Sequence, residues 1–464
     1  MELRDVKKEL VAAIAGPRNP SRADPVDPYV PSSGNHGYRV TRYELDLTYK
    51  MSSNRLRGTA VITATASEPL RTLHLDLSPH LDVSAVTADR CRVTRFTRPR
   101  GKLAVTLAEP LAVGSAVTLT IRYGGNPRPV RGTWGEVGWE ELTDGVLVSG
   151  QPNGAASWFP CDDHPSAKAP FHLRLTTDSP YRAVVTGALV GKKRSGSTTT
   201  WEFDLPQPTP TYLVAVNLGR YEHLEMVGGA VPVRAYLPAE LKRDFREAFA
   251  RQVEMLDVFT DLFGPYPFDE YKIVVTDDDL EIPLEAMGMS TFGRNMVRAN
   301  TSEERLIAHE LAHQWFGNSV TAAEWKHIWL HEGFACYAEW LWTEFSGGPT
   351  AADHAEHYYA RVRDSPQDIL LADPGPEDMF DDRVYKRGAL TLHSLRQALG
   401  DEAFFTLLRT WMARHSGSTV TTDDFLHLAG DHSPVSLRPL WDAWLFSRPL
   451  PTTFGMPDDH SDRH

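Results

Sequence analysis

Hydrophobic and polar residues alternate along the first half of the chain. Between residues 38 and 50, the sequence YRVTRYELDLTYK puts its large apolar side chains mostly at every second position, which is the period of a β-strand with one buried face. Six more short stretches are rich in β-branched residues and are separated by Gly, Pro or Asp clusters; they span residues 57–66, 71–78, 102–110, 116–125, 171–179 and 211–219. This spacing predicts an antiparallel all-β domain that ends near Glu222.

The period of the pattern changes after Pro238. Residues 238–264 carry apolar side chains at helical spacing and end at Gly264-Pro265, a typical helix stop. Two strands are predicted at 272–279 and 287–293, and helical patterns fill roughly residues 303–445. The predicted fold class is therefore α+β multidomain, with an N-terminal antiparallel β domain followed by an α-rich domain.

The expected domain limits follow from these patterns. Prolines recur between residues 16 and 35 and disfavour both a helix and a central strand, so residues 1–27 are expected to form a partly disordered N-terminal leader. The β domain is assigned to residues 28–222 and the α-rich domain to residues 223–450. The polar, aperiodic residues 451–464 are expected to form a flexible tail.

Composition and charge narrow the range of partners. The chain has 464 residues, of which 41% are hydrophobic and 23% are charged, as in an ordinary globular protein. Its 48 basic and 61 acidic side chains give a net charge of −13, which argues against nucleic acid or an anionic membrane as the main partner. No apolar run approaches the roughly 20 residues that span a bilayer. We therefore expect neither a nucleic-acid partner nor a membrane partner.

The cysteines indicate a compartment. Cys91, Cys161 and Cys336 form no CxxC pair, so the sequence supports neither a disulfide framework nor a thiolate zinc site. A cytoplasmic location is therefore expected. A short apolar stretch that ends at Ala15 resembles a secretory leader, but acidic residues precede it, so export is the minor alternative.

The strongest chemical signal is the sequence HELAH at residues 309–313. We expect a helix that begins at Thr301 or Ser302, either of which can cap it. His309 and His313 are four residues apart and so lie on one helix face, where two ring nitrogens can bind one zinc ion at about 2.0–2.1 Å. Glu310 is then positioned to act as a base toward water at the metal.

The HExxH pattern alone also has a plainer interpretation, because two histidines at helical spacing are often ordinary core or surface residues. The next predicted helix has an apolar stripe, and Glu332 falls on that stripe. A buried, unpaired carboxylate is costly, so Glu332 should become neutral, pair with a cationic side chain or bind a metal. Two histidines and one carboxylate leave the fourth zinc position open for water. His309, His313 and Glu332, with 18 residues between the last two, therefore predict a zinc hydrolase with one Zn²⁺ per chain.

Three stretches of the chain resemble the aminopeptidase N family of gluzincins, which are zinc peptidases with a Glu as third ligand. Residues 309–340 follow that family's core almost without a gap, residues 151–169 resemble its domain junction, and residues 384–396 resemble a third motif. The resemblance covers roughly residues 36–446. It implies a thermolysin-like catalytic domain after the β domain, in a short form that stops near Pro451 without the family's further domains.

The resemblance also implies roles for three more residues. Tyr385 occupies the position of the tyrosine that stabilises the oxyanion, and Glu285 that of the acid that holds the substrate ammonium. The family's usual motif there is Gly-Ala-Met-Glu-Asn, whereas this chain has Ile-Pro-Leu-Glu-Ala at residues 282–286. The residues that anchor this alignment are Gly288, Thr291 and Phe292. Gln151 matches a residue that helps to hold the amino terminus, and an ordinary loop amide bonded to backbone is the alternative at this position.

The predicted activity is therefore a zinc aminopeptidase that acts on peptides with a free N-terminus. A zinc endopeptidase or a specialised processing protease of the same family is an alternative, because the motif around Glu285 is altered. An epoxide reaction on the same zinc core is a smaller alternative. An inactive homologue that serves as a binding scaffold is the alternative from another class. The sequence leaves open the oligomeric state and the preferred N-terminal residue.

Overall fold

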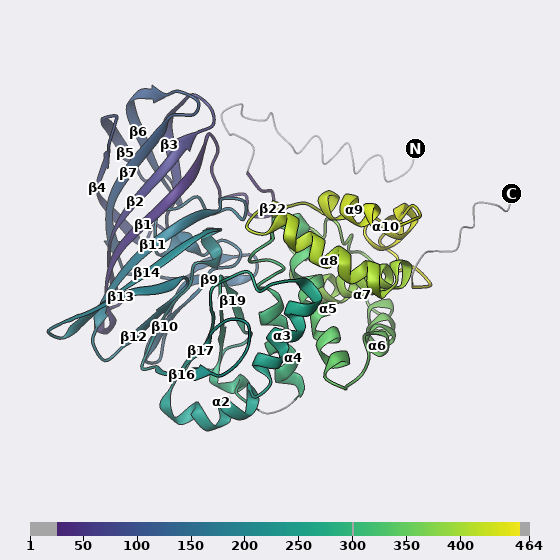
Figure 1. The fold of residues 1–464 in the computed structure, drawn as a ribbon. Coiled ribbons are helices and arrows are strands. Elements are labelled where there is room, and N and C mark those ends of the chain that lie inside the picture. Colours follow the sequence, from purple (N-terminus) through teal and green to yellow (C-terminus); the bar gives the residue numbers. More distant parts are fainter. Residues whose placement is uncertain (1–25, 299–300, 455–464) are drawn as a thin grey trace.

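The computed structural model describes residues 26–298 and 301–454. A β-rich part and a helical part lie side by side (Figure 1). The predicted fold class is confirmed, since mostly antiparallel strands come first and a helical domain follows. Most of the predicted leader, the end of the predicted tail and the side chains proposed to cap the helix at Thr301 or Ser302 lie outside the described residues.

The largest sheet has seven strands in the order β13-β14-β11-β1-β2-β7-β4. Its strands are β1 (Tyr38–Lys50), β2 (Arg55–Ala66), β4 (Leu81–Ala88), β7 (Ala116–Gly125), β11 (Ala169–Asp178), β13 (Ala188–Ser195) and β14 (Thr198–Thr209). The alternation of β1 shifts by one residue after Val40, where its pairing with β2 contains a β-bulge. β1 pairs with β11 in parallel, which is an exception to the predicted antiparallel arrangement.

Two smaller sheets complete the first domain. One has the order β3-β6-β5 and the other β12-β15-β10-β9-β8. Their strands are β3 (Leu70–Asp76), β5 (Val93–Thr97), β6 (Lys102–Leu111), β8 (Val130–Gly132), β9 (Gly135–Leu142), β10 (Gly145–Ser149), β12 (Arg182–Val185) and β15 (Val216–Gly219). The single strand predicted at 211–219 is wrong in its first part, because residues Thr211–Leu213 form a 3₁₀ turn before β15.

A mixed sheet with the order β16-β17-β18-β20-β19 follows in the chain. Its strands are β16 (Glu222–Met226), β17 (Val233–Leu237), β18 (Tyr271–Val275), β19 (Leu284–Ala286) and β20 (Met289–Phe292). The two strands predicted in this region correspond to β18 and β20, whereas the short hairpin partner β19 was not predicted. Glu285 lies on β19, opposite Ser290 of β20. The chain passes to this sheet between β15 and β16; the domain limits assigned above stay predictions.

Helices form most of the remaining chain. They are α2 (Lys242–Ala248), α3 (Gln252–Phe263), α4 (Thr301–Ala312), α5 (Trp329–Phe345), α6 (Ala351–Arg363), α7 (Asp382–Leu399), α8 (Asp401–His415), α9 (Thr422–Asp431) and α10 (Arg438–Trp444), and the short strands β21 (Thr321–Ala322) and β22 (Thr419–Val420) pair between them. The single helix predicted over 238–264 is divided, because Phe249 leaves the helix and packs against Phe245 and Phe292 at ring-centroid distances of 4.5 and 5.2 Å. Within the described residues, we find no helix with the length and apolar character that a membrane crossing requires.

Helices α5 and α7 approach each other closely at two glycines. A Cβ atom on Gly333 would lie 2.8 Å from the Cα of Gly388, and one on Gly388 would lie 2.6 Å from the Cα of Gly333. Neither position therefore admits a side chain without moving a helix backbone. This approach brings Glu332, which precedes Gly333, close to Tyr385, which lies one turn before Gly388.

Candidate metal centre and substrate cavity

Helix α4 carries the HExxH sequence and holds its two histidines on one face. The backbone N–H of His313 donates to the carbonyl oxygen of His309 at 3.2 Å. The helical turn therefore continues to His313, one residue beyond the last residue assigned to α4. The centroids of the two imidazole rings are 4.7 Å apart. The rings meet edge to face, at an interplanar angle of 81°. Both histidines thus lie on one face of the helix, as the four-residue spacing predicts.

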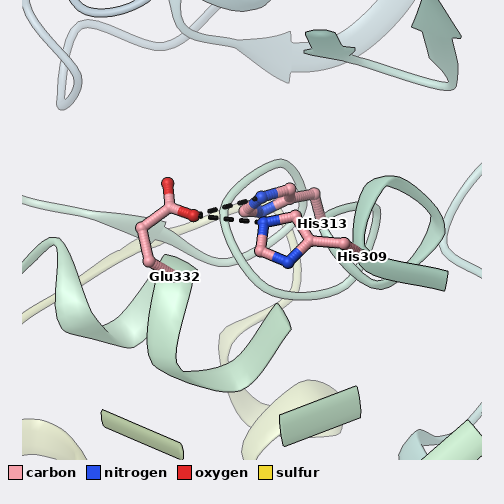
Figure 2. A group of neighbouring side chains, drawn as sticks. All are labelled: His309, His313 and Glu332. Atoms are coloured by element: carbon pink, nitrogen blue, oxygen red, sulfur yellow. Dashed lines mark ion pairs between the residues drawn. The ribbon is translucent and has the colours of Figure 1, made fainter. Parts of the chain in front are cut away.

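Glu332, in the first turn of α5, points its carboxylate at both histidines (Figure 2). Its Oε2 atom lies 3.3 Å from Nε2 of His309 and 3.4 Å from Nε2 of His313. The candidate ligand atoms of the three residues all lie within 4.8 Å of one another. Two imidazole nitrogens and one carboxylate oxygen are the donor set of a catalytic zinc site with an open position. The residues present therefore fit the ion that the sequence predicts.

The charges of these groups depend on one another. Burial alone would raise the pKa of Glu332, but His313 and His309 hold it well below its ordinary value of 4.5. Burial also disfavours the cationic form of His313, yet Glu332 and Glu285 raise its pKa to about 10. Glu332 thus requires positive charge beside it, and a divalent cation bound there would supply that charge.

A second carboxylate on α5 holds His309 from behind. Oε1 of Glu339 lies 2.7 Å from Nδ1 of His309, and Arg305 donates to Oε2 of Glu339 at 2.7 Å. This arrangement leaves Nε2 of His309 facing Glu332 and fixes the ring orientation. Glu339 was not among the predicted site residues, although it lies seven residues after Glu332, so both acids are on one face of the helix.

The general-base candidate Glu310 has an unpartnered oxygen. Its side chain is 4% exposed, and its Oε2 atom has no hydrogen-bond partner among the described residues. Burial raises the pKa of Glu310 to about 8, against the opposing effect of His309 and His313. An orphaned buried acceptor next to the metal-site residues is suited to bind water or substrate.

Tyr385, on α7, lies next to the His309 ring. Its ring is nearly parallel to the His309 ring, with centroids 5.9 Å apart and an interplanar angle of 18°. Burial raises the pKa of Tyr385 well above its ordinary value of 10.0. The phenol therefore stays protonated at neutral pH and can donate a hydrogen bond.

The strand that carries Glu285 is attached to the end of α4. Nδ2 of Asn318 donates to the carbonyl oxygen of Ala286 at 2.9 Å, and the backbone N–H of Gly288 donates to Oε1 of Gln314 at 2.9 Å. Burial raises the pKa of Glu285, while His313 opposes this rise. A cationic group bound beside Glu285 would restore its charged form.

Gln151 comes from the first domain, between β10 and β11. Its Nε2 atom is buried and has no hydrogen-bond partner among the residues that the structure describes. This nitrogen therefore does not form the bond to backbone that the alternative interpretation of Gln151 expects. A buried amide without a partner is free to contact a ligand.

One cavity brings the predicted site residues together. It has a volume of about 430 Å³, and its walls include the three metal-site residues, Glu310, Tyr385, Glu285 and Gln151. Other polar and aromatic side chains of the wall were not predicted from the sequence; they include Arg305, Glu339, Tyr358, Arg361, Asp382 and Lys386. Residues from both domains thus face one space, where a ligand would meet all seven predicted side chains.

The chain is similar to known proteins over most of its length. Residues 247–444 match the family described as "Peptidase family M1 domain", and residues 40–213 match "Peptidase M1 N-terminal domain". Aminopeptidase M1-D of Oryza sativa subsp. japonica is 28% identical over 444 residues, which are 87% of this chain and 49% of that protein. Endoplasmic reticulum aminopeptidase 1 of Homo sapiens is 27% identical over 418 residues, which are 82% of this chain and 44% of that protein. The chain thus spans about half the length of these two aminopeptidases.

Two solved structures match this chain over nearly the whole length of both proteins. The M1 zinc metallopeptidase from Deinococcus radiodurans has a TM-score of 0.85 and 32% identity, over 94% of this chain and 100% of that chain. A mutant of the same enzyme bound to a Tyr-Ser-Ala substrate also has a TM-score of 0.85 and 32% identity, with the same coverage.

Proposed function

The chain belongs to peptidase family M1, a family of zinc metallopeptidases, and on that premise we propose that it is a zinc aminopeptidase. In this proposal it hydrolyses the first peptide bond of peptides with a free amino terminus. One observation carries the proposal: Glu285 and Gln151 line the same cavity as the metal-site residues. The Tyr-Ser-Ala substrate bound to the related Deinococcus enzyme supports a peptide as the substrate.

The metal-site residues would hold one Zn²⁺ through Nε2 of His309, Nε2 of His313 and the carboxylate of Glu332. When bound, zinc supplies Lewis-acid chemistry, since it polarises a carbonyl and makes water more acidic. Glu339 keeps the His309 ring in its ligating orientation through the bond to Nδ1. His313 has a similar contact, because its Nδ1 lies 3.1 Å from the carbonyl oxygen of Phe316.

Two side chains would perform the proton and charge transfers. Glu310 accepts a proton from the attacking water through its unpartnered oxygen and passes it to the leaving nitrogen. Tyr385 donates a hydrogen bond from its protonated phenol to the oxygen of the scissile carbonyl, where negative charge develops.

Glu285 and Gln151 would select the amino terminus. Glu285 pairs with the substrate ammonium, which compensates the burial of its carboxylate. Gln151 stands on the opposite side of the domain junction, and its side-chain oxygen accepts a hydrogen bond from the same ammonium. A substrate held in this way offers only its first peptide bond to Glu310, so single amino acids are released.

Two peptides that differ only in N-terminal acetylation test the proposal. We expect the zinc-loaded protein to release the first residue of the free-amine peptide and to leave the acetylated peptide intact, as followed by mass spectrometry of the products. Equal cleavage of both peptides at internal bonds would instead identify an endopeptidase. No turnover of any peptide in a broad panel would favour the inactive scaffold.

A variant pair assigns the effect to Glu285. We expect Glu285→Gln to raise KM for the free-amine peptide, because the ammonium loses its counter-charge. Glu281→Gln is the matched control, since Glu281 is an exposed acid four residues earlier and is not among the cavity wall residues. Equal kinetics in both variants would contradict the role of Glu285.

A further inference from the structure

The cavity has a cationic wall formed by α4, α6 and α7, and its three cations are neutralised to different degrees. Arg305 is paired with Glu339 at 2.7 Å. Lys386 lies 3.8 Å from Asp382, at the outer limit of an ion pair, and its Nζ donates to Sγ of Cys336 at 3.3 Å. Among the described residues, Arg361 forms no ion pair, and its guanidinium donates no hydrogen bond, although it lines the cavity. Arg361 thus offers a full set of donors to whatever enters.

Arg361 and Lys386 share one aromatic ring. The guanidinium carbon of Arg361 lies 5.6 Å from the centroid of the Tyr358 ring, and Nζ of Lys386 lies 4.8 Å from the same centroid. Trp340 stacks on Tyr358 with centroids 5.4 Å apart and an interplanar angle of 1°, which holds the ring in place. The ring attracts both cations. Arg361 and Lys386 therefore belong to the same part of the cavity wall, where an anion could contact both.

The same cavity also has acidic wall residues. Glu285 is half-buried and Glu310 is buried, and both line the same space as Arg361. The cavity wall therefore carries both signs of charge, and Arg361 is a cation there that forms no ion pair within the described residues. A zwitterionic peptide has the complementary charges at its two ends.

We propose that Arg361, assisted by Lys386, binds a carboxylate of the peptide substrate. This inference rests on the proposed function, which identifies the cavity as a peptide site. The carboxylate has two sources, the free C-terminus of a short peptide or an acidic side chain. The volume of about 430 Å³ is near the lower end of the range for ligand sites, about 300–1,000 Å³. A short peptide with a free C-terminus fits such a space.

Binding to a slowed variant tests the inference without depending on turnover. In zinc-loaded Glu310→Gln protein, calorimetry compares Tyr-Ser-Ala with its C-terminal amide. We expect the free acid to bind about tenfold more tightly, as a charge-assisted hydrogen bond to arginine provides. Introducing Arg361→Gln into the Glu310→Gln protein should remove this preference for the free acid over the amide. A second pair, Glu-Ser-Ala amide and Gln-Ser-Ala amide, tests an acidic side chain as the source.

Arg363→Gln is the matched control, because Arg363 is an exposed arginine on the same helix that pairs with Asp364. It should leave the preference for the free acid unchanged. An Arg361-dependent preference in either peptide pair supports the carboxylate site and identifies the source. Equal affinities for acid and amide in both pairs, or a preference that survives Arg361→Gln, would overturn the inference.

The two proposals fail in different ways. If Tyr-Ser-Ala binds with an Arg361-dependent preference but the unmodified protein never releases its first residue, the proposed function fails and the carboxylate site remains. If the residue is released without any such preference, only the carboxylate site fails.

Discussion

Buried carboxylates gather in two regions of this molecule, one in each domain. In the β domain, Asp76, Asp162 and Asp163 form what we call the aspartate cluster. Asp76 accepts hydrogen bonds from the backbone N–H groups of Gly34 at 3.1 Å and Asp163 at 3.0 Å, and it pairs with Lys102. Burial, reinforced by repulsion from Asp76, raises the pKa values of both Asp162 and Asp163 to about 7.

Two carboxylates at the metal site, Glu332 and Glu339, have the opposite tendency, whereas burial raises the pKa values of Glu310 and Glu285 in the same cavity. Burial acts on Glu332 and Glu339 as well, but the pKa of Glu339 falls to about 2 because Lys386, His309 and Arg305 surround it. Likewise, His313 and His309 lower the pKa of Glu332, which lies between them, against the effect of burial. These acids stay charged because cationic groups face them.

The comparison separates structural acids from acids arranged for a ligand. Both groups are buried, so burial alone does not identify a site. The metal-site acids have cationic neighbours and line a cavity. Asp76 also has a cationic partner, Lys102, besides its backbone N–H donors, but none of the three aspartates is among the cavity wall residues. A buried carboxylate that lines a cavity is therefore a better indicator of chemistry than the direction of its pKa shift.

The largest expected effect is that of Glu310→Gln. Loss of the proton acceptor should lower kcat by about 10²–10⁴-fold, while the zinc content stays at one per chain because the ligands are unchanged. Steady-state kinetics and elemental analysis of the same sample check both parts. Full turnover in this variant would remove Glu310 from the mechanism. Because its Oε2 has no partner in the described residues, we expect no loss of thermal stability.

Tyr385→Phe should have the next largest effect. Removal of one oxyanion donor lowers kcat by about 10²–10³-fold, and KM should change little because the ring remains. Steady-state kinetics with a free-amine tripeptide, which give kcat and KM separately, measure this. An unchanged kcat would reduce Tyr385 to a packing role beside His309.

Glu339→Gln should act on the metal rather than on the chemistry. Without the charged partner of His309, zinc affinity should fall by about 10–100-fold, as measured by competition with a chelator. Glu344→Gln is the matched control, since Glu344 lies on the same helix and forms an ion pair with Arg396 away from the metal site. Equal zinc affinities in both variants would contradict the orienting role of Glu339.

The smallest effect is expected in the aspartate cluster. Folded Asp162 has a pKa of about 7 and the ordinary value is 3.8, so the folded state holds a proton that the unfolded state has lost between these values. Stability should therefore fall as the pH rises from about 4 to 7. Asp162→Asn removes the free-energy cost of ionising this buried carboxyl group. It should therefore raise the free energy of unfolding by the order of 1 kcal/mol at pH 8, without changing kcat.

Denaturant unfolding at pH 4 and pH 8 measures this pH dependence. Asparagine keeps an oxygen to accept from Nδ2 of Asn35, which lies 3.1 Å from Oδ1 of Asp162. Asp46→Asn, at an exposed acid of the same domain, is the control and should bring no such gain. A variant that is less stable than the parent at pH 8 would show that Asp162 is needed as a charge.

Local patterns in the sequence predicted much of this molecule. The alternation over β1 gave the strand and its buried face, because neighbouring side chains of a strand point to opposite sides. The spacing of His309 and His313 needed only helical geometry. Glu332 followed from a charge on an apolar stripe, and family resemblance supplied Tyr385, Glu285 and Gln151.

Features that depend on distant partners could not be predicted in the same way. The parallel pairing of β1 with β11 joins segments more than a hundred residues apart. The break between α2 and α3 depends on Phe249 packing against Phe292. The bond between Glu339 and His309 requires two helices to be in place. Likewise, Arg361 lies on α6 and Lys386 on α7, so the cationic wall could not be predicted without knowing how these two helices pack.

Zinc content tests the central claim most directly. Elemental analysis of the isolated protein, supplemented with zinc and freed of excess metal, should give close to one zinc per chain. Glu332→Gln, which replaces one ligand by a neutral amide of the same shape, should lose most of this metal under the same treatment. A wild-type protein that never reaches stoichiometric zinc, or a variant that retains it fully, would contradict the assignment of His309, His313 and Glu332 as the metal site.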